Sequence, residues 1–223
     1  MPRKYNTYAP GAKHGQEVVQ PLTVKDWQRM CQLCMLEKEA AEKGSQAYYR
    51  AYRNYILLLV GVNVGARISD LLEFTPRNFA GGRCEYKAHK TGKLVRYMID
   101  EAIYKDIRAY VEEFHLSTNA FLFQATGRKH SSDRISRQQA WNEIHRIADA
   151  AGIEYCVGTH SLRKSYGRWL YDEGMNLSDV AALLQHNDPI VTLRYICIDS
   201  ESTKQKREAV NFVPKFRPKN GAT

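Results

Sequence analysis

The chain has 223 residues, of which 43% are hydrophobic and 26% are charged, and its formal net charge is +9 at pH 7. This composition is typical of a soluble globular protein and excludes collagen-like and intrinsically disordered chains. The longest apolar stretch, Tyr55–Val62, has eight residues, whereas a membrane-spanning helix needs roughly 20. The polar first residues hold no apolar signal core. We therefore expect a cytoplasmic protein that does not associate with membranes.

The five cysteines are an odd number spread through the chain, which argues against a disulfide framework. Cys31 and Cys34 form a CxxC pair, but the pair lies within a helical pattern and no second pair of ligands at zinc spacing follows. We expect ordinary reduced thiols and no metal site.

The surplus of positive charge favours a polyanionic partner. Between Thr203 and Thr223, six lysines and arginines stand against one acidic residue. A solvated basic tail and direct contact with phosphate groups are both compatible with this distribution.

Periodicity and capping residues predict helices in the first part of the chain. Residues 1–21 show no periodicity and are expected to form a flexible basic arm. Thr23 is a typical N-cap, and Gly44 and Gly65 are typical of helix ends. The helices predicted here cover residues 24–43, 46–63 and 68–74.

The pattern then changes to the period of two that is typical of strands. Apolar and polar residues alternate over 84–88 and 95–99, on either side of the turn residues Thr91 and Gly92, which predicts a β-hairpin. Residues 121–123 are a candidate for a short third strand. Further helices are predicted over 101–116, 136–151, 160–173, 177–185 (with Ser178 as its cap) and 202–211.

These elements predict an α+β fold that is mostly helical, with one small antiparallel β-sheet inserted among the helices. One domain is expected over residues 22–212, between the arm and a basic tail over 213–223. The chain has no glycine-rich phosphate loop, GxSxG elbow or HExxH helix, so nucleotide hydrolysis, serine esterase chemistry and zinc proteolysis lack support.

Two polar motifs lie in the first half of the chain. Arg67 stands at the entry to a short amphipathic helix in GARISDLL, where a surface ion pair with Asp70 is the simpler reading. Lys90 stands in the hairpin turn HKTGK, where a lysine is usually just solvated.

Three further motif residues lie in the second half. His160 and Arg163, three apart at the start of a helix in GTHSLR, share one face beside free backbone amides that favour an anion. His186 ends a helix in LLQHN, and Tyr195 follows nine residues later. Taken alone, a helix-terminal charge and a packed ring explain His186 and Tyr195 equally well.

The order and spacing of these motifs over residues 22–195 resemble the catalytic domain of the tyrosine recombinases, the phage integrase family. The resemblance implies the tyrosine recombinase catalytic fold, with Tyr195 as the nucleophile and Asp70 supporting the first arginine. Gln185 stands where the family often has glycine. The residues that the resemblance implies to surround one DNA phosphate are Arg67, Lys90 (rather than Lys93), His160, Arg163 and His186.

The chemistry of phosphoryl transfer agrees with this set of side chains. Two arginines can bind the non-bridging oxygens, histidines can donate or relay protons near neutral pH, and a lysine can protonate the leaving 5′ oxygen. We expect a site-specific recombinase or integrase that cleaves and rejoins DNA by metal-free transesterification through a 3′-phosphotyrosyl intermediate, without a cofactor.

The resemblance also implies the partners, namely double-stranded DNA with specific recombination sites and a homo-tetramer assembled on that DNA. The chain is similar in size to the fimbrial DNA invertases, and a natural short form and a fragment of a longer protein both remain open. A type IB topoisomerase that relaxes supercoils and a non-catalytic DNA-binding regulator are the alternative functions.

Overall fold

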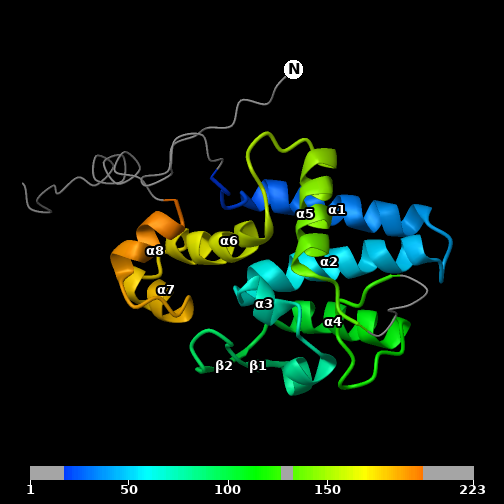
Figure 1. The fold of residues 1–223 in the computed structure, drawn as a ribbon, viewed down its shortest axis with the longest axis horizontal. Helices are drawn as coiled ribbons and strands as arrows, with labels where there is room; N and C mark the ends of the chain where they lie inside the picture. Colours follow the sequence, from blue (N-terminus) through cyan, green and yellow to red (C-terminus); the bar gives the residue numbers. More distant parts are fainter. Residues whose placement is uncertain (1–17, 127–132, 198–223) are drawn as a thin grey trace, which may run out of the picture.

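The computed structural model describes residues 18–126 and 133–197 and shows a mostly helical protein with one small β-sheet (Figure 1). The predicted α+β class is therefore confirmed. The helices are α1 (Val24–Ala40), α2 (Gln46–Val64), α3 (Ile68–Leu71), α4 (Glu101–Glu113), α5 (Arg137–Ala150), α6 (Thr159–Asp172), α7 (Leu177–Leu183) and α8 (Pro189–Tyr195). A 3₁₀ segment, η1, covers Pro76–Gly82, and the strands are β1 (Arg83–Lys87) and β2 (Leu94–Met98).

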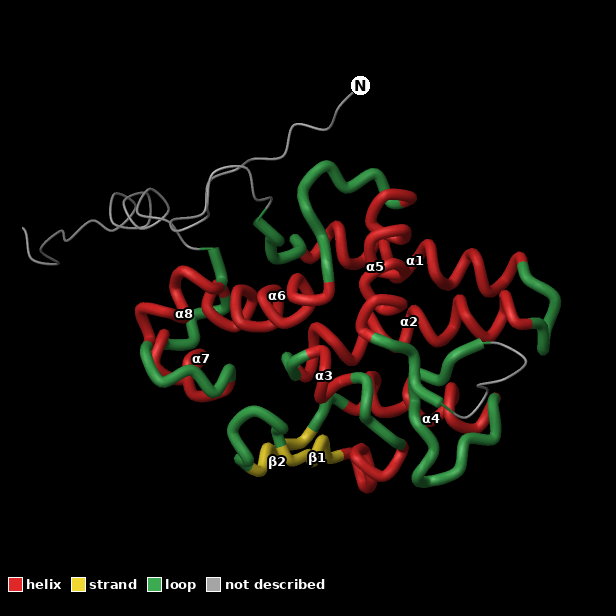
Figure 2. The backbone as a smooth tube through the Cα atoms, in the orientation of Figure 1, coloured by secondary structure: helices red, strands yellow, loops and turns green. Residues whose placement is uncertain are grey.

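Helices α1 and α2 pack side by side and supply much of the core (Figures 1 and 2). The Thr23 side chain caps α1 by accepting from the backbone N–H of Asp26, as its position predicted. The second half of α2 is buried, and the helix ends at Gly65, which has the left-handed φ of 62°. An added Cβ at Gly65 would lie 2.2 Å from the Tyr166 ring, so this turn requires glycine.

The predicted β-hairpin is confirmed, with β1 and β2 antiparallel and Cys84 opposite Tyr97. The Tyr97 hydroxyl donates to the Val64 carbonyl at 3.0 Å, so the hairpin is anchored to the end of α2. The turn closes through the Gly92 N–H, which donates to the Ala88 carbonyl at 2.8 Å. The tip of this turn carries Lys90 and Thr91.

Two sequence predictions are wrong in detail. Residues 121–123 form no strand: Leu122 and Phe123 are both buried, and only Gln124 makes an isolated bridge, to Arg134. The cap of α7 is Asn176, whose side chain accepts from the Asp179 N–H at 2.9 Å, and not Ser178. The predicted helix over 202–211, the tail over 213–223 and most of the predicted arm lie outside the described residues.

Two separate hydrophobic cores hold the described part of the chain together. The larger one is centred on α2 and reaches every element from α1 to α6. The smaller one consists of Val180, Leu184 and Ile196 and joins α7 and α8 to α6. At Gly167 of α6 an added Cβ would lie 2.8 Å from Leu184 Cδ1 and 2.9 Å from Ile196 Cγ2, so α7 and α8 sit directly on the α6 backbone.

The segment that leads into α1 is bound to α6 by three hydrogen bonds. Lys164 Nζ donates to the Val19 carbonyl at 2.7 Å, and Trp169 Nε1 donates to the Leu22 carbonyl at 2.9 Å. The Leu22 N–H donates to Ser165 Oγ at 2.7 Å. The start of the described chain is thereby fixed to the middle of the domain.

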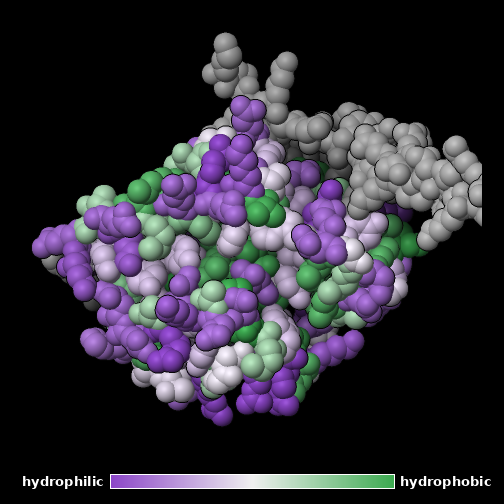
Figure 3. Space-filling view, turned by 180° about the vertical axis from the view of Figure 1, so that it is seen from behind, coloured by the Kyte–Doolittle hydropathy of each residue, from purple (hydrophilic) through white to green (hydrophobic). Residues whose placement is uncertain are grey.

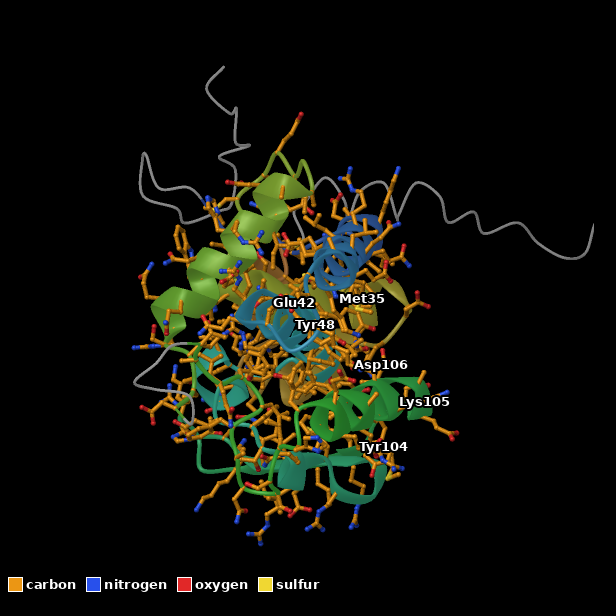
Figure 4. The ribbon with its side chains drawn as sticks, turned by 90° about the vertical axis from the view of Figure 1, so that its right-hand side faces the viewer. Met35, Glu42, Tyr48, Tyr104, Lys105 and Asp106 are labelled. Atoms are coloured by element: carbon orange, nitrogen blue, oxygen red, sulfur yellow. The ribbon has the colours of Figure 1, made fainter. Side chains whose placement is uncertain are left out.

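The end of the molecule formed by α1, α2 and α4 is shown in Figure 4, where Tyr48 of α2 and Asp106 of α4 are labelled. Aromatic rings pack together here, with Tyr49 and Phe114 centroids 4.7 Å apart. The Tyr55 hydroxyl donates to the Asp106 carboxylate. These contacts stabilise the helices, and α7 and α8 lie at the opposite end (Figure 1).

The surface seen from behind is mostly hydrophilic, with hydrophobic side chains in small separate patches (Figure 3). Among the described helices, none combines the length and the apolar character that a bilayer-spanning segment needs.

Candidate active site

A cleft of about 720 Å³ opens between α3, the hairpin turn, the first turn of α6, the end of α7 and α8. In Figure 2 the turn between β1 and β2 lies beside α7. All six residues that the sequence singled out line this one cleft, although they come from separate parts of the chain. They are Arg67, Lys90, His160, Arg163, His186 and Tyr195.

Two arginines supply fixed positive charge to the cleft. Arg163 is 4% exposed, and its Nη1 donates to the Gly65 carbonyl at 2.6 Å while Nη2 donates to the Leu184 carbonyl. Burial lowers the Arg163 pKa, but a guanidinium titrates so far above neutrality that the charge remains. Arg67 Nη1 donates to Gln185 Oε1 at 3.2 Å. Two such groups can bind the non-bridging oxygens of a phosphodiester.

The pKa values of both cleft histidines are lowered. Burial, followed by the charges of Arg163, Arg67 and Lys90, lowers the pKa of His186 to about 4. Its Nδ1 lies 3.0 Å from Thr192 Oγ1. His160 lies at the edge of the cleft, where desolvation and the nearby charges of Lys164 and Arg163 lower its pKa. A neutral imidazole can accept a proton.

Tyr195 is the last residue of α8, and its ring meets the His186 ring edge-on with centroids 5.0 Å apart. Within residues 18–126 and 133–197, its buried hydroxyl oxygen has no hydrogen-bond partner. Burial raises the pKa of this hydroxyl, and the charges of Arg163 and Arg67 oppose that rise. The phenol is therefore protonated at neutral pH and must lose its proton to act as a nucleophile.

Lys90 and Asp70 occupy different positions around the hairpin turn. Lys90 lines the cleft, whereas Lys93, the other lysine of the turn, does not. Asp70 is 3% exposed, and its Oδ1 accepts from the His89 N–H at 3.2 Å. The surface ion pair between Arg67 and Asp70 is not formed, so that simpler reading is wrong. Asp70 instead holds the backbone next to Lys90.

The cleft residues that were not identified as site residues from the sequence include Arg137, Thr91 and Gln185. Arg137 directly follows the Ser136 cap of α5, and nothing in its spacing distinguishes it from a solvated arginine. Thr91 was identified only as a turn residue. Gln185 was noted only as a departure from glycine, and the structure gives it a left-handed φ of 52°.

The described part of the chain holds no cluster of potential metal ligands. None of its histidine, cysteine and acidic side chains form a group of three that could hold a metal ion. Cys31 and Cys34 are buried in the larger core, and burial raises the pKa of Cys34 to about 12. These thiols pack as small apolar side chains.

Comparison with known proteins gives the same family that the motifs indicated. The profile of the Phage integrase family matches residues 34–202. The probable integrase/recombinase YoeC of Bacillus subtilis (strain 168) is 31% identical over 153 residues, which cover 68% of this chain and 81% of that protein. Tyrosine recombinase XerA of Thermococcus kodakarensis is 25% identical over 171 residues, which cover 74% of this chain and 57% of that protein.

Solved structures share the fold. The crystal structure of XerA recombinase has a TM-score of 0.66 at 15% identity, covering 91% of this chain and 68% of that chain. XerH site-specific recombinase bound to palindromic difH substrate has a TM-score of 0.65 at 19% identity, covering 92% of this chain and 57% of that chain. The fold and the cleft define a tyrosine recombinase catalytic domain. This chain belongs to the phage integrase family. It spans 57% of the length of Thermococcus kodakarensis XerA and 57% of the XerH chain.

Proposed function

We propose that the chain is the catalytic domain of a site-specific DNA recombinase, which breaks and rejoins DNA strands through a 3′-phosphotyrosyl intermediate. The observation that carries the proposal is the convergence of Tyr195 with two arginines, two histidines and a lysine in one cleft. We assign this domain to residues 22–212, flanked by the segments 1–21 and 213–223.

Strand cleavage follows from the groups around the cleft. The Tyr195 oxygen forms a bond to phosphorus while the bond from phosphorus to the 5′ oxygen breaks. A bound DNA phosphate offsets the charges of Arg163, Arg67 and Lys90 that help to hold the His186 pKa low. His186, whose ring contacts the Tyr195 ring, then accepts the phenolic proton, and Lys90 gives a proton to the departing 5′ oxygen. Arg67 and Arg163 stabilise the charge on the non-bridging oxygens. Rejoining reverses these steps, and the energy of the phosphodiester is conserved in the tyrosyl ester.

His160 and Arg137 line the cleft from α6 and α5. His160 lies one helical turn from Arg163 on α6, and Arg137 lies at the start of α5. We assign both residues to binding the phosphate at the cleavage point and the DNA phosphates next to it. The first turns of the two helices also offer free backbone N–H groups for such contacts.

Double-stranded DNA is the partner that this cleft fits. A net charge of +9 favours a polyanion, and the similar XerH structure is bound to its difH substrate. We further propose that the enzyme acts at specific recombination sites and that four protomers assemble on two duplexes, because exchange of four strands requires four nucleophiles.

The deciding experiment is to trap the covalent intermediate on nicked DNA, from which the cleaved strand diffuses away. The wild-type protein should form an adduct at particular sites, and Tyr195→Phe should bind the same DNA within about twofold and form none, since it loses only the attacking oxygen. Cleavage by the Phe variant would overturn the assignment of the nucleophile. Adducts without site preference would indicate a topoisomerase, and binding without any adduct would indicate a regulator.

A further inference from the structure

Gln185 combines two unfavourable features at one position in the cleft. Its backbone has a φ of 52°, in the left-handed region that side chains other than glycine rarely adopt. Its amide Nε2 is buried and has no hydrogen-bond partner among the described residues. Costly features of this kind persist in binding sites when a neighbouring contact requires them.

The side-chain oxygen of Gln185 makes that contact. Oε1 accepts from Thr91 Oγ1 at 2.6 Å and from Arg67 Nη1 at 3.2 Å. A guanidinium has only donors, so the amide must turn its oxygen towards Arg67 and its NH₂ group away. The orientation that satisfies Arg67 and Thr91 therefore leaves Nε2 unpaired.

The Thr91 hydroxyl connects the tip of the hairpin turn to Gln185, which lies just after α7 on the other side of the cleft. The base of the turn is held by Asp70, which accepts from the His89 N–H, and by the Gly92 to Ala88 hydrogen bond. Within the described residues, neighbouring Lys90 makes no hydrogen bond or ion pair of its own. Its long side chain is thus positioned by the turn alone.

We propose that Gln185 is a positioning residue for Lys90, acting through its hydrogen bond with Thr91. The amide oxygen fixes the tip of the hairpin turn relative to Arg67, so that the ammonium group of Lys90 and the phosphate held by Arg67 meet in one geometry. This inference rests on the proposed role of Lys90 as the acid that protonates the leaving 5′ oxygen.

The test compares cleavage of ordinary DNA with cleavage of DNA in which sulfur replaces the bridging 5′ oxygen. Sulfur leaves without needing a proton, so it restores the rate only where proton donation is impaired. Thr91→Val removes the donor and keeps the shape of the side chain, whereas Thr91→Ser keeps the hydroxyl. We expect Thr91→Val to cleave ordinary DNA about 10-fold more slowly and sulfur-containing DNA at the wild-type rate. Thr91→Ser should remain within about twofold of the wild type on both.

Two further variants make the outcome decisive. Gln185→Gly should be rescued by sulfur only in part, because it also removes the hydrogen bond that holds Arg67. It should unfold at or above the wild-type temperature because glycine suits the left-handed backbone at this position. Lys90→Ala tests the proposed function itself, and absence of rescue in this variant would overturn the role of Lys90. Rescue of Lys90→Ala without rescue of Thr91→Val and Gln185→Gly would overturn the positioning role alone. A wild-type rate for Thr91→Val on ordinary DNA would also overturn it.

Discussion

Replacement of Gly167 by alanine should impair cleavage without unfolding the protein. The added Cβ would lie 2.8 Å from Leu184 Cδ1 and 2.9 Å from Ile196 Cγ2, whereas carbon atoms in contact lie about 3.5–4.0 Å apart. Leu184 can turn its terminal methyl group away, but relief of the Ile196 contact requires α8 to move by roughly 0.6 Å, counted from the short end of that contact range. Ile196 is β-branched and has few rotamers with which to avoid the contact. Tyr195, its neighbour in the chain, must move with it.

Gly167→Ala should lose much of its cleavage rate but little of its free energy of unfolding. A displacement of reacting groups by 1 Å can cost about 100-fold in rate, so Gly167→Ala should form the covalent adduct about 10- to 100-fold more slowly. Overpacking lowers the free energy of unfolding by about 1–3 kcal/mol. The change from glycine to alanine within a helix raises it by about 1 kcal/mol. The free energy of unfolding should therefore fall by no more than about 2 kcal/mol.

Single-turnover adduct formation and thermal unfolding measure the two effects. Ile107→Ala is the control for lost stability, because Ile107 is buried in the larger core on α4 and does not line the cleft. That variant should lose stability while the folded fraction retains activity. Adduct formation by Gly167→Ala at the wild-type rate would show that the position of Tyr195 does not depend on this contact.

Other predictions concern pH, metal ions, thiols and assembly. Because the pKa of His186 is about 4 in the folded protein and about 6.5 in an unfolded chain, the unfolded state binds a proton first as the pH falls. Protonation of His186 in the unfolded chain should lower the free energy of unfolding by on the order of 1 kcal/mol, after solvent screening, between pH 6.5 and pH 4. In chemical denaturation, the stability of His186→Gln should depend less steeply on pH. Cleavage should persist in EDTA, and its loss in EDTA with recovery on adding magnesium would contradict the metal-free mechanism. Cys34 should resist alkylation in the native protein and react once it is unfolded, as mass spectrometry can follow. Truncation after Ser200 should retain some DNA binding but lose recombination of paired sites, and unchanged recombination would refute a role for the C-terminal segment in assembly.

The elements that the sequence predicted well have strong local signals. Thr23 and Gly65 mark helix ends through their own capping and backbone preferences, and the alternation around Gly92 predicted the hairpin. Helix α8 was not predicted because seven residues beginning with Pro189 are too short to show a period. Residues 121–123 looked like a strand, but Leu122 and Phe123 are buried by tertiary packing without a sheet partner.

The candidate site likewise contains some residues that the sequence identified and others that it did not. Six of the cleft residues were found because they lie in short motifs with a fixed order along the chain. Arg137 lies in no such motif, Thr91 was identified only as a turn residue, and only folding brings both to the cleft. The double hydrogen bond of Gln185 joins positions 94 and 118 residues away, and no local pattern can reveal a contact over that separation.

The dense packing around α6 limits how far its sequence can vary. One face of the helix lines the cleft with His160 and Arg163, while buried Leu162 and Ser165 face the interior. Lys164 binds the segment that leads into α1, and Gly167 leaves room for α7 and α8. Because nearly every side of this helix has a different neighbour, a neutral substitution there must satisfy one specific partner rather than merely preserve hydrophobicity. In a pool of functional variants, α6 should consequently hold far less sequence diversity than α4, whose outer face is exposed in the described part of the chain.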